Sequence, residues 1–532
     1  MSTIGGIIFT SFFTVSGVLA SILFSLWYLF TFQHPEDKLR AWIPKIVMCT
    51  STFMALFTVF LLPIDIAFAD LDLFPFLFVW IAVAAIDVIL LLFVLPFAIV
   101  YYEALDTKPN IIKQLLKAVL TAAGLFLVFT VVIVITWFVF GEALIPVQTY
   151  GSDLVASTSF SASDLGALTV SSLSSSSKTL NLNLMIHLHV IAFASVIGMV
   201  LFIIFASVGA VAIPMDLISE WRYRPRPFSN DRVAQFRIVF RNRAMMLKEI
   251  AQKYTDDMKE RQEDAIDGKK RRLTRAERKL PNRIREASRQ LEKEYDYIQI
   301  STGAKRYLPL LYWGKLVVAV LLFCLSALWL VHLVLFVLPE EPLHPGLNLI
   351  FRVFENFLPF LGTALYSVFA VYLLACTVKG VTRLGTRILL FANIHPLEKH
   401  NTYSNALMFN AMVMLLISLA LVRFLCTSFS VYARATSANI IFNSICDNLA
   451  FIRHAFPWAY FTMPFIAVAA LLLLVIFPRK NELVDRLLQN DLTKAIKTAT
   501  EGKKGDRFID SIKNVKKLKL GKARERGADD NV

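Results

Sequence analysis

Long apolar stretches recur along the whole chain and are separated by short polar connections. A helix needs roughly 20 consecutive apolar residues to cross the hydrocarbon core of a bilayer. Stretches of this length with at most one or two polar interruptions are found at 4–32, 118–140, 184–214, 316–338, 356–378 and 456–477. Three more, at 46–69, 74–102 and 403–425, contain one charged residue each, namely Asp65, Asp87 and Arg423. The pattern therefore predicts an all-α, polytopic transmembrane helix bundle of about nine spans.

The composition excludes an ordinary soluble protein. Of the 532 residues, 56% are hydrophobic, 18% are charged and 44 are Phe. Soluble globular chains contain about 45–50% apolar and about 25% charged residues. The chain is therefore predicted to be integral to a membrane.

Lys and Arg are distributed unevenly between alternate connections. These residues resist translocation and accumulate on the cytosolic side, whereas acidic residues have little effect. Besides the region after Pro214 and the C-terminal tail, the basic connections contain Lys38, Arg40, Lys45, Lys108, Lys113, Lys117, Lys379, Arg383, Arg387 and Lys399. The connections between them are poor in basic residues. An odd number of spans then predicts an exterior or lumenal N-terminus and a cytosolic C-terminus.

The spans and connections divide the chain into four regions. A membrane region of five predicted spans covers 1–214 and includes an exterior, Ser-rich loop at 141–183. A basic cytosolic insert covers 215–307, a second membrane region with four predicted spans covers 308–478, and a basic cytosolic tail covers 479–532.

The insert contains two amphipathic helical patterns. The apolar residues that share one face of the first are Val233, Phe236, Val239, Met246 and Ile250. After a turn signal with Gly268 and Pro281, the second pattern contains Ile284, Leu291, Tyr295 and Ile298. Two antiparallel helices would form a hairpin of coiled-coil type that projects from the membrane. The sequence leaves open whether this hairpin is a partner-binding platform or a solvated connector.

Two apolar runs close on the same pattern of Pro, apolar residue, Asp and apolar residue, at 63–66 and 214–217. Pro near a helix end stops the helix, so we expect each helix to end there. Asp65 and Asp216 are then expected at the membrane interface, either hydrated or hydrogen-bonded to freed backbone groups. The second run is followed by basic residues, which with Asp216 form a candidate interface: Arg222, Arg224 and Arg226.

Charges inside a span are expensive, by about 2.5–3.5 kcal/mol on insertion scales, and usually face the bundle interior. Asp87 lies near mid-span, and its short side chain cannot reach the headgroups, so we expect it to face the interior. Arg423 lies near the exterior end of its span, where its long side chain could reach the interface. The sequence leaves open whether Arg423 does so or is a partner of Asp87.

Four segments, in this order along the chain, carry a family resemblance: "LLPIDIAF", "VLPFAIVYYEALD", "AIPMDLISEWRYRP" and the basic helical insert that ends at "RYLPLLYWGK". They resemble the limb region membrane protein family, which includes a lipocalin receptor, a lysosomal cobalamin escort and a regulator of receptor signalling. The resemblance implies a nine-span α-helical protein with an exterior N-terminus and a central cytosolic insert. It implies no catalysis and supplies no set of site residues.

The chain contains no phosphate-binding loop, no His-Glu-x-x-His zinc pair and no Gly-x-Ser-x-Gly nucleophile turn. We therefore expect a protein that is not an enzyme and holds no cofactor or metal.

The basic cluster at 269–272 is more typical of contact with anionic lipid or an acidic protein than with nucleic acid, because the chain is predicted to lie in a membrane. Whether Cys426 and Cys446 form a disulfide outside the membrane is left open.

The C-terminal tail is a second candidate for contact with anionic lipid. Each basic residue near a membrane surface contributes about 1 kcal/mol of attraction. Four lysines of the tail are the candidates for this contact, namely Lys513, Lys516, Lys517 and Lys519.

The apolar stretch within 382–400 is too short to span a membrane, which favours an interfacial element or a re-entrant turn.

Two functional hypotheses follow. In the first, the protein is a receptor or a trafficking or signalling adaptor, and the insert binds a cytosolic or membrane partner. In the second, it is a transporter, or the escort of a transporter, for a small molecule such as a vitamin or lipid-like ligand. The small number of charged residues inside spans favours the first hypothesis. The sequence leaves open whether the protein is located in the plasma membrane or in an endolysosomal membrane. It also leaves open whether the oligomeric state is a monomer or a homodimer.

Overall fold

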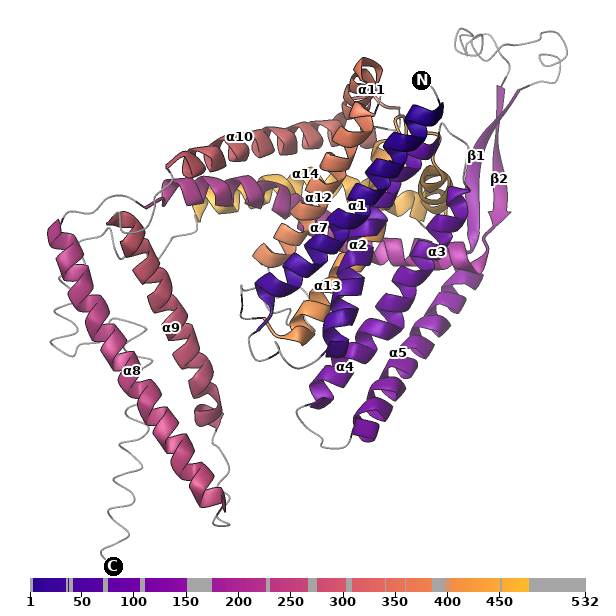
Figure 1. Cartoon of the computed structure of the whole chain (residues 1–532). Coiled ribbons are helices and arrows are strands. Elements are labelled where there is room, and N and C mark those ends of the chain that lie inside the picture. Colours follow the sequence, from indigo (N-terminus) through magenta and orange to yellow (C-terminus); the bar gives the residue numbers. More distant parts are fainter. Residues whose placement is uncertain are drawn as a thin grey trace, which may run out of the picture. The chain divides into compact units, whose positions relative to one another are not determined.

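The computed structural model describes residues 3–34, 37, 42–69, 75–105, 111–150, 175–225, 230–266, 275–302, 309–339, 341–358, 360–384, 397, 400, 402–449 and 452–477 (Figure 1). The chain forms two compact units. The membrane unit comprises Met1–Met215 and Ala319–Phe477, and the insert unit comprises Asp216–Val318 and Pro478–Val532.

Mostly apolar helices form the membrane unit, and two of them, at 186–222 and 309–332, continue into the insert unit. They are α1 (Thr3–Phe32), α2 (Trp42–Ala69), α3 (Phe76–Ile89), α4 (Leu95–Leu105), α5 (Ile111–Phe140), α7 (Ile186–Arg222), α10 (Pro309–His332), α11 (Leu347–Phe357), α12 (Leu361–Leu384), α13 (Ser404–Ser428) and α14 (Ile452–Ile476). The short π-helices η2 (Leu90–Val94) and η5 (Leu333–Val337) join α3 to α4 and extend α10. Within the described residues, nine helical segments are long and apolar enough to cross a membrane, which confirms the predicted count.

The two Pro–Asp runs do not end their helices, which corrects the expectation from the sequence. Pro63 lies inside α2, and Pro214 lies inside α7, which continues to Arg222. Both prolines are buried, and a helix that packs on its neighbours tolerates Pro because surrounding groups satisfy the freed backbone. Asp65 is only 2% exposed and is therefore not a hydrated interface residue.

Helices α7 and α12 approach each other closely through two glycines. Gly209 of α7 lies against the backbone of Cys376, and Gly380 of α12 lies against the backbone of Phe205. A Cβ atom at either position would overlap a carbonyl group of the other helix. Small residues at such crossings let helix backbones pack without a layer of side chains between them, which provides van der Waals contact inside a membrane.

A β-hairpin replaces part of the loop predicted at 141–183. Strand β1 (Glu142–Tyr150) pairs antiparallel with β2 (Ser175–Asn183), with Glu142 opposite Asn183 and Tyr150 opposite Ser175. The Ser-rich composition suggested a loop, but each segment is long enough for its backbone groups to be satisfied by the other strand. An isolated bridge between Ala143 and Leu449 joins β1 to the connection between α13 and α14.

The insert unit contains the predicted helical hairpin, formed by α8 (Asn230–Ile266) and α9 (Arg275–Ser301). Between the two helices, Arg243 forms an ion pair of 3.0 Å with Glu294, and the rings of Phe240 and Tyr295 lie 5.1 Å apart. The buried apolar residues of the hairpin are Phe236, Leu247, Leu291 and Ile298.

Two details of the predicted hairpin are wrong. Met246 is 45% exposed, and its neighbour Leu247 is buried instead, because Leu247 lies about three full helical turns after the buried Phe236. Pro281 lies inside α9 rather than in the turn before it. The turn residue Gly268 and the cluster at 269–272 lie outside the described residues.

The glycine contact yields a first prediction. Gly380→Ala should destabilise the protein by about 1–3 kcal/mol, because the added methyl group pushes α12 away from Phe205. Thermal unfolding of the detergent-purified full chain measures the effect. Gly124→Ala in α5 is the control, since a Cβ there meets nothing within 4 Å and Ala favours a helix. Equal loss of stability in both variants would contradict the close packing.

Candidate functional site

The connection between α13 and α14, residues 429–449, is a buried and folded element. It contains the π-helix η7 (Asn439–Ile445) and the short 3-10 helix η8 (Cys446–Asn448). Its apolar side chains pack into the core, including Phe429, Ala438, Ile441, Phe442, Cys446 and Leu449. We call it the 429–449 segment. A connection with so many buried groups needs hydrogen-bond partners from the bundle, and three sets of polar side chains provide them.

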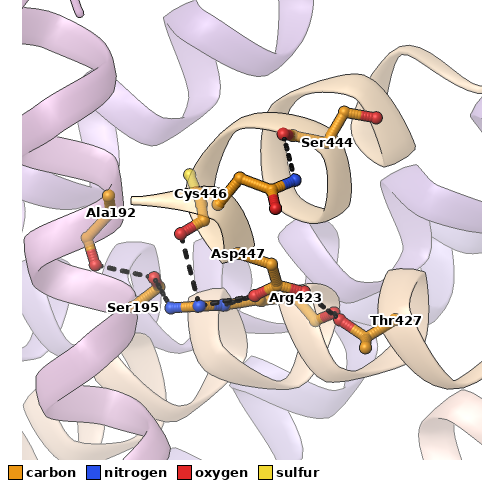
Figure 2. A network of polar contacts seen from close by, with 8 residues as sticks. Ala192, Ser195, Arg423, Thr427, Ser444, Cys446 and Asp447 are labelled. Carbon is orange, nitrogen blue, oxygen red and sulfur yellow. Dashed lines mark hydrogen bonds and ion pairs between the residues drawn. The ribbon is translucent and has the colours of Figure 1, made fainter. Parts of the chain in front are cut away.

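The first set is centred on Arg423, near the end of α13 (Figure 2). Its Nε donates to Asp447 Oδ1 over 2.6 Å, and Nη2 makes an ion pair with the same oxygen over 2.5 Å. Nη1 donates to Ser195 Oγ of α7 over 3.3 Å, and Nη2 also reaches Cys446 O at 3.5 Å. The guanidinium lies 3.8 Å from the ring centroid of Phe456 in α14. Arg423 thereby joins α7, α13, α14 and the 429–449 segment.

This arrangement corrects both interpretations of Arg423. The side chain is 0% exposed, so it does not extend to the interface, and its acidic partner is Asp447 rather than Asp87. A fully buried guanidinium must have its charge and its N–H groups matched, because its desolvation is otherwise too costly. Asp447 is matched in turn, since Thr427 Oγ1 donates to its Oδ2 over 2.6 Å.

Cys446 is next to Asp447 but has no features of a reactive thiol. Burial raises the pKa of Cys446 to about 12, an effect that the charge of Arg423 only partly opposes. The protonated thiol is therefore the form present at neutral pH, whereas nucleophilic or metal-binding cysteines are thiolates. Cys426 and Cys446 are both buried, free cysteines.

The second set is centred on Asp65 of α2. Its Oδ2 accepts hydrogen bonds from Trp80 Nε1 of α3 over 2.8 Å and from the backbone N–H of Ala438 over 2.9 Å. The Trp80 ring also packs edge-on against Phe442, with ring centroids 5.8 Å apart. Asp65 therefore caps the start of the helical part of the 429–449 segment, as a carboxylate does at a helix N-terminus.

The third set holds the beginning of the segment. Glu355 Oε2 of α11 accepts hydrogen bonds from the hydroxyl of Tyr432 and from the backbone N–H of Thr363, each over 3.0 Å. The backbone N–H of Tyr432 donates to Asn348 Oδ1 over 3.1 Å. Sequence reasoning missed Glu355, Tyr432 and Asp447. The signal that could have found Asp447 is its position as an acid in a connection close to the charge of Arg423.

The opposite end of α13 is also held by a carboxylate. Asp37 Oδ2 accepts hydrogen bonds from the backbone N–H and the hydroxyl of Ser404, over 2.9 and 2.8 Å. Tyr102 of α4 donates to Asp37 Oδ1 over 2.9 Å. Since α13 is among the most deeply buried helices described, these contacts position the centre of the bundle.

Asp87 differs from the other buried carboxyl groups. It is 1% exposed, and Thr58 Oγ1 of α2 donates to its Oδ2 over 2.7 Å. Among the described residues, Oδ1 has no hydrogen-bond partner. Asp87 lies one turn before the π-helix η2, and π-helical turns inside α-helices are frequent at functional sites.

The remaining candidate residues do not join these sets. Asp216 and Arg222 lie in the last part of α7, and Arg224 follows it. Arg226, Lys513, Lys516, Lys517 and Lys519 lie outside the described residues, as does most of the stretch at 382–400. In the part of the chain that is described, no group of three His, Cys, Asp or Glu side chains could hold a metal ion.

Comparison with known proteins places the fold in a family context. The model of the LMBR1-like membrane protein family matches residues 10–302 and 299–476. A LIMR family protein of Arabidopsis thaliana is 28% identical over 488 residues, which cover 86% of this chain and 94% of the relative. A LIMR family protein of Dictyostelium discoideum is 25% identical, with 86% and 95% covered. No solved structure matches the chain.

The Arg423–Asp447 pair yields a second prediction. Arg423→Ala should lower the free energy of unfolding by about 3–5 kcal/mol, because Asp447 is left without its cation and Ser195 without a donor. The double variant Arg423→Met/Asp447→Leu should recover most of this loss, since no buried charge remains.

Thermal unfolding of the purified full chain compares these variants with Arg434→Ala, in which an exposed arginine of the same segment is removed. If Arg423→Ala were as stable as Arg434→Ala, the ion pair would not hold the 429–449 segment.

Proposed function

The chain belongs to the LMBR1-like membrane protein family and is an integral, multi-pass membrane protein, and from this premise we propose that it is a receptor or a trafficking or signalling adaptor and not an enzyme. The α8–α9 hairpin is its partner-binding surface. We place this hairpin on the cytosolic side, in agreement with the charges of the connections.

The observation that carries this proposal is the exposed face of α8. Ile238 is 60% exposed and Met245 is 52% exposed, and they lie seven residues apart, on one face of the helix. The exposed charged side chains beside them on α8 are Arg237, Arg241, Lys248 and Glu249, so basic residues outnumber the acid. A connector needs no apolar residues on its solvent side. An apolar stripe between basic residues fits a partner that has an apolar patch surrounded by acidic residues.

The buried charges of the membrane unit support the same function. Arg423 and Asp65 bind the 429–449 segment to the bundle, and their hydrogen bonds are used within the fold. Charged residues on a transport pathway must instead be able to exchange partners with a substrate or ion. Two of the three candidate intramembrane charges therefore support the fold rather than a pathway.

Asp87 is the observation that favours the alternative, a transporter or transporter escort. A buried carboxyl group with one unpartnered oxygen destabilises the fold, and a role for that oxygen beyond folding would account for this cost. A proton or a polar group of a small ligand would match this oxygen.

A third prediction concerns the hairpin surface. The double variant Ile238→Glu/Met245→Glu should reduce partner capture at least tenfold, because two carboxylates replace the apolar stripe and repel an acidic partner. Affinity capture of the tagged full chain in mild detergent, quantified by mass spectrometry, measures the change.

The control for this surface is Thr255→Glu, which adds a carboxylate at an exposed position on a different face of α8. Both proteins should insert and elute as the wild type does. An unchanged set of partners in the double variant would contradict the platform and favour the connector.

A fourth prediction separates the two functions. Asp87→Leu should express normally and lose at most about 1–3 kcal/mol of stability, because it removes the unpartnered Oδ1 but also takes the acceptor from the Thr58 hydroxyl. If the protein is an adaptor, the variant also captures the same partners. Normal folding together with loss of ligand uptake or of ligand-dependent growth, with Asp87→Asn as the isosteric comparison, would instead identify Asp87 as part of a ligand pathway.

A further inference from the structure

Two tryptophans and an arginine form a cluster where α7 ends and α10 begins, inside the insert unit. The rings of Trp221 in α7 and Trp313 in α10 lie 5.5 Å apart at an angle of 64°. The guanidinium carbon of Arg224 is 4.8 Å from the Trp221 ring centroid and 5.8 Å from that of Trp313. Both tryptophans are at helix ends next to a span, where tryptophan is enriched at the membrane–water interface. The cluster therefore lies at headgroup level.

The polar groups of this cluster are incompletely used. Arg224 Nη1 donates to the backbone carbonyl of Trp221 over 3.2 Å, but among the described residues Arg224 has no acidic partner. Stacking on the indole faces leaves the other N–H groups of the guanidinium available at its edge. Trp221 Nε1 is buried and has no hydrogen-bond partner in the described part of the chain. The edge of the guanidinium carries only donors, so a group that binds there is an acceptor.

The surrounding charges favour an anion. Arg222 is exposed and contacts only the Tyr223 ring among the interactions described for it, with 5.9 Å to the ring centroid. Lys315 holds the nearby acid Glu220 in an ion pair of 2.7 Å, so this carboxylate does not compete for Arg224. The second acid of this region, Asp216, is half-buried in α7. Arginine recognises phosphate through paired N–H donors.

An apolar surface lies beside the donors. In the first three turns of α10, large exposed apolar side chains flank Trp313, namely Leu310, Leu311, Val317 and Val318. In the membrane these side chains contact acyl chains. A ligand that matches both surfaces has a phosphate group and a hydrocarbon tail.

We propose that Trp221, Arg224 and Trp313 form a binding site for the phosphate-bearing headgroup of an anionic phospholipid, with Arg222 as a second cation. The phosphate oxygens accept hydrogen bonds from the edge of the Arg224 guanidinium, which the two indole rings hold in place, while the acyl chains lie along α10. This site uses none of the residues of the basic tail, and it anchors the point at which the insert leaves and re-enters the membrane.

Native mass spectrometry of the full chain in a neutral detergent tests the site. The protein is titrated with phosphatidylserine or phosphatidylcholine, and the bound lipids are counted. Wild-type protein should bind one phosphatidylserine more tightly than the rest, and Arg224→Gln should weaken this binding about fivefold. Trp221→Ala, which removes one of the two ring faces that hold the guanidinium, should weaken it as well.

The matched control is Arg434→Gln, which removes one exposed positive charge from the membrane unit and should leave lipid binding unchanged. Equal binding of phosphatidylserine by Arg224→Gln and Arg434→Gln would overturn the proposal. A second arm adds the water-soluble headgroup glycerophosphoserine. Failure to compete at the lipid's concentration supports a membrane lipid as the ligand, whereas equal competition would assign the site to a free phosphate ester and overturn the lipid assignment.

Discussion

The ion pair between Arg423 and Asp447 is the interaction on which the α13–α14 connection depends. A guanidinium without exposed surface needs a partner for its charge and acceptors for its N–H groups, and Asp447, Ser195 and Cys446 supply them. These partners come from α7 and from the 429–449 segment. Because matching Arg423 requires that segment to lie on the bundle, the segment packs its apolar residues inward rather than forming a loop in water.

The same constraint extends to the other buried charges. Asp65 binds the start of η7 through Ala438, Glu355 binds Tyr432, and Asp37 binds the start of α13 at Ser404. Each carboxylate accepts from a backbone N–H or a hydroxyl that the apolar core would otherwise leave unsatisfied. Asp87 departs from this pattern, since one of its oxygens has no partner within the described residues. That difference marks Asp87 as the intramembrane position where a function besides folding is best sought.

The two units interact with their surroundings through different kinds of surface. The membrane unit presents an apolar exterior to lipid, and the buried charges Asp65 and Arg423 serve its internal connections. The insert unit has a small hairpin core, an exposed apolar stripe on α8, and the Trp221–Arg224–Trp313 cluster next to the membrane. A lipid bound at that cluster would fix the base of the hairpin, while the exposed face of α8 would remain available for a protein partner. This division suits an adaptor, because anchoring and recognition use separate surfaces.

The sequence by itself determined the helices, because a run of about 20 apolar residues has few stable alternatives in a bilayer. It also predicted the α8–α9 hairpin, since the 3.6-residue period of its apolar positions is local information. Only the tertiary structure decided the partners of the charged residues. Asp447 lies 24 residues after Arg423, so its position in the next connection makes it a candidate partner, but no helical period selects it. Asp65 and Ala438 are 373 residues apart, and no pattern in the sequence relates them. The continuation of α2 and α7 past their prolines was likewise decided by packing, because neighbouring helices satisfy the backbone that Pro would leave open.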